Sequence, residues 1–164
     1  MFGLSFKEKT TEALQRGTKA ALTGGFFHYT QAQRFGLNDE ATSWLYTEAL
    51  AHQIYMLGLL YKNSTLGKYK WATYEFSIKS ITSALTDHEI KEGLTPGSIS
   101  SFVFKRCYEI DQLTPKERET GEEYSQSAKL IADKDPRANQ KNITKALENA
   151  VGSYFEQARK MFGI

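Results

Sequence analysis

The stretch Asp39–Tyr61, with the sequence DEATSWLYTEALAHQIYMLGLLY, decides the fold. In a helix, which turns by about 100° per residue, its apolar side chains point in every direction around the axis. These side chains are Trp44, Leu45, Tyr46, Leu50, Ile54, Tyr55, Met56, Leu57, Leu59, Leu60 and Tyr61. A helix that is apolar on every side has to be covered on every side. We therefore predict that residues 39–61 form the central helix of a small all-α protein.

The length and composition are typical of one globular domain that spans residues 1–164. Hydrophobic residues make up 40% of the chain and aromatic residues 13%, which argues against disorder. The single cysteine, Cys107, has no partner for an internal disulfide, as expected in a reducing compartment. We therefore expect a cytoplasmic protein, although export by a route that needs no signal peptide is compatible with the sequence.

Neither a secretory signal nor a membrane span is predicted. Residues 1–22 contain six charged side chains and no apolar core run. The most apolar run, residues 49–61, contains His52 and Gln53 and is shorter than the roughly 20 residues that cross a bilayer. The formal net charge of +2 is too small to imply nucleic acid or anionic lipid by itself.

Start and stop signals divide the rest of the chain into further helices. Ser5 with Glu8, and Thr114 with Glu117, have the spacing of a capping box. We predict a compact bundle, orthogonal or up-down, of about six helices around residues 39–61 and a long C-terminal helix. The expected helical segments are 5–22, the short 26–35, 39–61, 68–85, 97–110, 115–133 and a last one from Asp135-Pro136 to 162.

The apolar patterns also predict where these helices lie. Residues 5–22 have modest apolar content and residues 115–133 are the most polar helix, so we expect both at the surface. Residues 139–162 carry a regular apolar stripe that includes Ile143, Leu147 and Tyr154. This last segment is the best candidate to lie against the central helix.

Two segments need a choice between structures. In residues 68–85, Trp71, Tyr74 and Ile78 begin a helical spacing that holds for about fifteen residues, whereas a strand-like alternation holds for about five, so we favour a helix. Residues 87–97 are polar and broken by glycine and proline, which predicts a loop. At its end, Thr95 is expected to cap the next helix, with Pro96 as the first helical residue.

Glu48 and His52 are the polar pair that could carry chemistry, because they lie four residues apart on one face of the central helix. One interpretation is a buried pair that is satisfied by neighbouring groups. The alternative is an acid and a base, or ligand contacts, in a pocket lined by Trp44 and Tyr55, as in a helical enzyme or small-ligand binder. We favour the structural interpretation.

Other catalytic and metal-binding patterns are missing from the sequence. The three histidines and Cys107 show no zinc-type spacing, and the Glu-x-x-His pattern of di-iron bundles does not occur. A serine elbow and a phosphate-binding glycine loop are also missing. We predict no cofactor and no metal, and we do not favour an enzyme.

The turn at 61–71 interleaves lysines with aromatic rings, in Tyr61-Lys62 and in Lys68-Tyr69-Lys70-Trp71. This combination can follow phosphates and stack bases, so weak nucleic-acid binding is one hypothesis. The patch is short and contains no arginine, and we favour a plain turn whose lysine stems cover apolar surface.

A helical protein without a catalytic site usually works by presenting a surface, so we expect a protein–protein interaction module with another protein as its partner. A bacterial accessory, effector or immunity-type protein fits that class. The candidate contact surfaces are the aromatic segment of Phe26, Phe27 and Tyr29 and the turn with Tyr69 and Trp71.

Overall fold

The central stretch forms one continuous helix, α3 (Asp39–Asn63), in the computed structural model, which describes residues 5–24 and 33–164. The Asn38 side chain caps this helix by accepting a hydrogen bond of 2.8 Å from the backbone N–H of Ala41. Helices α1, α5, α7 and α8 and the short turn η1 all contact α3. The prediction of a central, enclosed helix is therefore confirmed.

The other described elements are also helical, which confirms the all-α class. They are α1 (Phe6–Thr23), the 3-10 turn η1 (Thr65–Lys68), α4 (Tyr74–Lys91), α5 (Ser98–Asp111), α6 (Pro115–Glu119), α7 (Glu122–Ala132) and α8 (Gln140–Met161). The structure contains no strand within residues 5–24 and 33–164. The helix predicted at residues 26–35 falls mostly outside these ranges.

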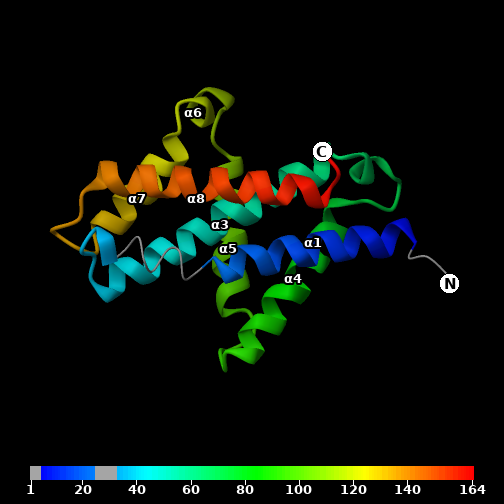
Figure 1. Cartoon of the computed structure of the whole chain (residues 1–164), viewed down its shortest axis with the longest axis horizontal. Coiled ribbons are helices and arrows are strands. Elements are labelled where there is room, and N and C mark those ends of the chain that lie inside the picture. Colours follow the sequence, from blue (N-terminus) through cyan, green and yellow to red (C-terminus); the bar gives the residue numbers. More distant parts are fainter. Residues whose placement is uncertain (1–4, 25–32) are drawn as a thin grey trace.

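Helices α1, α3 and α8 run along the long axis of the molecule (Figure 1). Helices α1, α3 and α8 lie side by side, while α4 and α5 pass across α1 and α3. The C-terminal helix α8 packs against both α3 and α7, which confirms that it lies against the central helix.

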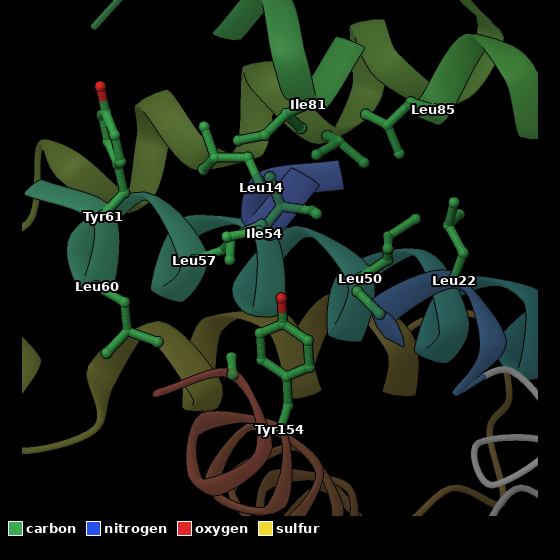
Figure 2. Packing of buried hydrophobic residues seen from close by; sticks show 14 of the residues in the cluster. Leu14, Leu22, Leu50, Ile54, Leu57, Leu60, Tyr61, Ile81, Leu85 and Tyr154 are labelled. Carbon is green, nitrogen blue, oxygen red and sulfur yellow. The ribbon is translucent and has the colours of Figure 1, made fainter. Parts of the chain in front are cut away.

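Most of the buried apolar side chains within residues 5–24 and 33–164 form two clusters that share α3. The large cluster joins α3 to α1, α4, α5 and the end of α8, and much of it is shown in Figure 2. Its fully buried members include Leu14, Leu50, Leu57, Leu85 and Val103. The small cluster consists of Ala41, Leu45, Ala49, Ala128, Ile131, Ile143 and Leu147, from α3, α7 and α8.

Helix α1 lies at the surface as predicted, with one face exposed, but its inner face is more deeply packed than its composition indicates. Gly17 brings the α1 backbone against both α3 and α8. A Cβ atom at this position would lie 2.5 Å from Cδ1 of Leu57 and 3.3 Å from the hydroxyl of Tyr154. The Tyr154 hydroxyl also donates a hydrogen bond of 2.8 Å to the Gly17 carbonyl. Small and polar residues here allow close approach, which a count of large apolar residues misses.

The segment 68–85 is helical as favoured, but its boundaries differ. Helix α4 begins after its N-cap Thr73 and continues to Lys91, so the loop predicted at 87–97 begins later. Thr95 does not cap α5, which starts at Ser98 after Gly97 with φ +92°. The cap comes instead from the buried Glu89 of α4, whose Oε2 accepts hydrogen bonds of 2.9 Å from Ile99 N and 3.2 Å from Ser98 Oγ.

The segment 115–133 forms two helices, so the prediction of one continuous helix is wrong, whereas most of its side chains are exposed or half-buried, as expected of a peripheral segment. Gly121 adopts a left-handed conformation with φ +72°, which ends α6 and starts α7. One face of α7 is buried against α3 and α8 through Ser127, Ala128 and Ile131.

No helix within residues 5–24 and 33–164 is both long and apolar enough to cross a membrane.

Candidate functional site

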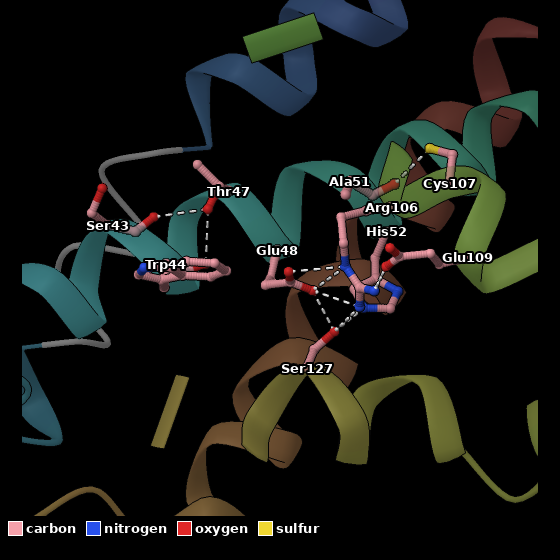
Figure 3. A network of polar contacts seen from close by, with 10 residues as sticks. All are labelled: Ser43, Trp44, Thr47, Glu48, Ala51, His52, Arg106, Cys107, Glu109 and Ser127. Carbon is pink, nitrogen blue, oxygen red and sulfur yellow. Dashed lines mark hydrogen bonds and ion pairs between the residues drawn. The ribbon is translucent and has the colours of Figure 1, made fainter. Parts of the chain in front are cut away.

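Glu48 and His52 lie one turn apart on α3 and face the same neighbours, as their spacing predicts (Figure 3). Both side chains are buried, and the Glu48 carboxylate is fully enclosed. A carboxylate in the interior needs compensating charge and hydrogen bonds. The structure supplies both, from residues far away in the sequence.

Arg106 of α5 provides the compensating charge. Its Nε lies 3.0 Å from Oε1 and 3.1 Å from Oε2 of Glu48, and its Nη2 lies 3.0 Å from Oε2. The same guanidinium donates through Nη1 to the carboxylate of Glu109, one turn further along α5. Arg106 is thus held by two carboxylates, and the planar guanidinium suits this forked geometry.

Ser127 of α7 connects Glu48 to His52. The Ser127 hydroxyl donates to Oε2 of Glu48 over 2.6 Å, and it lies 2.8 Å from Nε2 of His52. A hydroxyl has only one proton, so His52 has to donate from Nε2 to the serine oxygen. This direction is opposite to the one that activates a serine nucleophile, in which the histidine accepts the serine proton.

The surroundings keep His52 neutral. Burial, followed by the positive charge of Arg106, lowers the pKa of His52 to about 3. The ring of Tyr124 covers the imidazole at a centroid distance of 4.9 Å. A histidine with this pKa is a neutral imidazole near neutral pH and cannot act as a general acid, so the cluster of Glu48, His52, Arg106 and Ser127 has the properties of an internal polar network.

Trp44 and Tyr55, which the sequence placed beside this pair, take part in other contacts. The Trp44 ring meets Phe102 edge-on at 5.9 Å, and the ammonium of Lys134 lies 4.8 Å from its centroid. The Tyr55 hydroxyl accepts a hydrogen bond of 2.6 Å from Arg118 and donates one of 3.2 Å to Asp111. The structure therefore does not gather the four residues around one hollow.

Sequence reasoning missed Arg106 and Ser127, although each interrupts an apolar stripe. Arg106 lies three residues after the buried Val103 and four before the buried Ile110. Ser127 lies next to Ala128 and four residues before Ile131. A charged or polar residue at such a position is a signal for an interior partner, and Glu48 was that partner.

A groove lies between α3, α4 and α5, beside η1, with a volume of about 400 Å³. Its lining residues are Ile54, Tyr55, Gly58, Leu59, Tyr61, Lys62, Gly67, Ala72, Tyr74, Ser77, Ile78, Ile81, Phe104, Cys107, Tyr108 and Asp111. The floor is apolar and buried, with Ile54 and Ile81. The rim carries Tyr74 and Tyr108, which are 77% and 67% exposed. Tyr55 is the predicted pocket residue that lines this groove.

Cys107 lines the same groove but is not a reactive thiol. Burial raises its pKa to about 12, and its Sγ donates to the carbonyl of Ala51 over 3.4 Å. A thiol in this state contains almost no thiolate near neutral pH. In the part of the chain that the structure describes, no three His, Cys, Asp or Glu side chains are grouped to hold a metal ion.

The predicted contact residues Tyr69 and Trp71 belong to an aromatic cluster next to the groove. Tyr69 stacks on Phe6 of α1 at 5.6 Å and on Trp71 at 5.5 Å, and Trp71 meets Phe76 of α4 at 5.3 Å. The ammonium groups of Lys7 and Lys9 lie close to the rings of Phe76 and Phe6, at 5.8 and 5.7 Å from their centroids. The other predicted contact residues, Phe26, Phe27 and Tyr29, lie outside the described residues.

Known proteins give no further guide to the site. Neither a protein-family model, nor a curated protein, nor a solved structure matches this chain.

Proposed function

We propose that this chain is a protein–protein interaction module that holds an apolar segment of a partner protein in the groove between α3, α4 and α5. The observation that carries the proposal is the groove itself, with its buried apolar floor and two exposed tyrosines on its rim. Exposed aromatic side chains around an apolar depression are typical of contact surfaces, because tyrosine gives a large contact area at a small cost in conformational entropy.

The properties of the polar network support binding rather than catalysis. Glu48 and Ser127 are fully buried, and each already has a partner inside the protein. A substrate would have to displace Arg106 or Tyr124 to reach them. Neither Glu48 nor His52 lines the groove, so the exposed apolar surface and the titratable cluster are separate features.

The proposal can be tested by placing a photo-crosslinking amino acid at position 108, on the rim of the groove. The same amino acid at position 149, an exposed position on α8, is the matched control. Crosslinking in the cells that produce the protein, followed by mass spectrometry, should identify a partner segment that is captured from position 108 and not from position 149.

Binding of that identified segment is then measured with purified proteins. Tyr74→Ala and Tyr108→Ala should each weaken it by about 1–2 kcal/mol, as expected for aromatic contact residues, and the fold should be kept because both side chains are exposed. Equal capture from both positions, or unchanged affinity in the Tyr74→Ala/Tyr108→Ala double variant, would exclude this groove as the binding surface.

A small apolar ligand is the second candidate occupant, because about 400 Å³ lies within the size range of small-molecule sites. The small-ligand candidate can be tested at Gly58, which lines the groove and where an added Cβ atom would have no neighbour within 4 Å. Gly58→Trp fills space and should abolish binding of an apolar dye in the groove. Failure of such a dye to bind the wild-type protein would leave the protein partner as the occupant.

A further inference from the structure

One end of the groove is strongly basic, and the other end is not. Lys62 lines the groove, and Lys68 and Lys70 flank the same turn that contributes Gly67 and Ala72 to its wall. The stacking of Phe6 on Tyr69 brings the first turn of α1 to the same place, with Lys7 and Lys9. We call these five lysines, Lys7, Lys9, Lys62, Lys68 and Lys70, the basic corner.

The basic corner has no ion pair within the part of the chain that the structure describes. The ion pairs there involve Arg106, Lys134, Arg137 and Arg159 instead. Glu8, Glu12 and Glu75 are the nearby acids in sequence, and Glu8 is held at the start of α1, where its Oε2 accepts a hydrogen bond of 2.7 Å from Ser5 N. Positive charge therefore outweighs negative charge at this end of the groove.

The opposite end of the groove is charge-balanced. Tyr55 lies seven residues before Lys62 on α3, which is about 10 Å along the helix. There its hydroxyl connects the carboxylate of Asp111 to the guanidinium of Arg118. A ligand that spans the groove thus meets unpaired positive charge at one end and paired charges at the other.

From this asymmetry we infer that the partner segment is amphipathic and acidic, with apolar side chains that fill the groove and carboxylates that face the basic corner. The inference deepens the proposed function and rests on it. Oppositely charged side chains across an interface fix its orientation and accelerate association. About seven residues of helix, or two turns, match the distance between Tyr55 and Lys62.

A nucleic acid fits these features less well, although it would also neutralise the lysines. It would leave the apolar floor of the groove without a complementary surface. In addition, the ring of Tyr69 already stacks on both Phe6 and Trp71, so these rings are engaged with one another rather than offered to bases. An acidic peptide with apolar residues satisfies the groove and the lysines together.

The test selects peptides of about 16 residues from a random phage-displayed library on the immobilised full chain, and measures the affinity of the enriched peptides in solution. We expect them to combine apolar residues at helical spacing with several acidic residues. The triple variant Lys62→Glu/Lys68→Glu/Lys70→Glu should weaken binding about tenfold or more, and raising the salt from about 50 to about 300 mM should weaken it in the wild type.

A matched charge reversal on α8, Lys141→Glu/Lys145→Glu/Lys160→Glu, is the control, because these lysines are also exposed. It should change the affinity less than about twofold. Enriched peptides that lose binding in Tyr74→Ala/Tyr108→Ala but not in the triple variant would overturn the charge inference and leave the proposed function standing. Peptides that respond to neither variant would overturn both. Competition by a deoxythymidine oligonucleotide at the same lysines, without dependence on the tyrosines, would favour nucleic acid and overturn the inference.

Discussion

Arg106 stabilises charge in the interior rather than adding an exposed ion pair. Its partner Glu48 is fully buried, whereas the Arg159–Glu156 pair on α8 is open to solvent. Exposed pairs contribute little because water screens them, while a buried carboxylate that loses its partner keeps its full desolvation cost. The same contact type therefore has very different consequences at the two positions.

Arg106→Ala should lower the free energy of unfolding by about 3–5 kcal/mol, because it leaves the Glu48 carboxylate buried with only Ser127 as a partner. Arg159→Ala, which breaks an exposed pair, should cost less than about 1 kcal/mol. Urea unfolding followed by circular dichroism measures both. Similar losses in the two variants would contradict the role given to Arg106.

His52 should make the protein less stable as the pH falls below about 6.5. Its pKa is about 3 in the folded state and close to 6.5 when unfolded, so the unfolded chain binds the proton first. The contribution of the neutral His52 to the free energy of unfolding is present above pH 6.5 and is lost progressively as the pH falls towards 3. Between pH 7 and pH 5 the loss should be about 2 kcal/mol.

Urea unfolding at the two pH values, in wild type and in His52→Gln, isolates this contribution. The His52→Gln variant has no imidazole to protonate at this position, so its free energy of unfolding should fall by about 2 kcal/mol less than that of the wild type over the same pH range. His28 and His88 remain in both proteins and cancel in the comparison. An equal pH dependence in the two proteins would show that His52 is protonated in the folded state.

Among the elements, long apolar patterns and local caps could be predicted from the sequence. The central helix, the C-terminal helix and the capping boxes at Ser5 and Thr114 were all found in this way. These features depend on residues that are close together in the chain.

Helix ends set by distant residues could not be predicted. Helix α5 is capped by Glu89 of α4. The amino acids next to Gly97 do not indicate that the cap comes from another helix. The depth of α1 was missed for a related reason, because Gly17 counts as a poor helix former until a neighbouring helix is placed against it.

The two glycines in the middle of α1 and α8 allow this packing to be tested. Gly17→Ala should destabilise the protein by about 1–2 kcal/mol, because the new methyl group meets the fully buried Leu57. Gly152 of α8 is exposed, and a Cβ atom added there would have nothing within 4 Å, so Gly152→Ala should stabilise the protein by about 0.5–1 kcal/mol. Thermal unfolding of both variants measures these changes in stability. A gain in stability for Gly17→Ala would refute the close contact.

For the whole molecule, the two apolar clusters predict unequal resistance to opening. Among the residues that the structure describes, the large cluster contains fifteen buried residues and the small one seven, and the buried apolar residues of α7 belong to the small one. Helix α7 should therefore detach before α1, α3 and α4 separate. Native-state hydrogen exchange in low denaturant should give α7 amides a smaller opening free energy than those of α3.

The variant Ile131→Ala sharpens this test, since Ile131 is a fully buried α7 residue of the small cluster. It should lower the opening free energy of the α7 amides by about 2–4 kcal/mol. If the α7 and α3 amides of the wild type exchange with one common opening energy, the two clusters unfold as a unit and the prediction fails.

Only the residues of the candidate site that are close together in the sequence could be predicted. The sequence showed Glu48 and His52 on one face of a buried helix, but Arg106 and Ser127 lie 58 and 79 residues away from Glu48. The groove was beyond prediction altogether, because its wall combines the end of α3 with η1, α4 and α5. Which surfaces of a bundle stay open depends on how the helices cross, and helical patterns alone do not fix this.

The hydrogen bond between Tyr154 and Gly17 joins residues 137 positions apart. During synthesis at about 5–20 residues per second, the first helix waits on the order of ten seconds before its last neighbour is made. During that time the apolar middle of α3 is outside the ribosome without α8 packed against it. The nascent protein is therefore an expected customer of the chaperones that shield emerging chains.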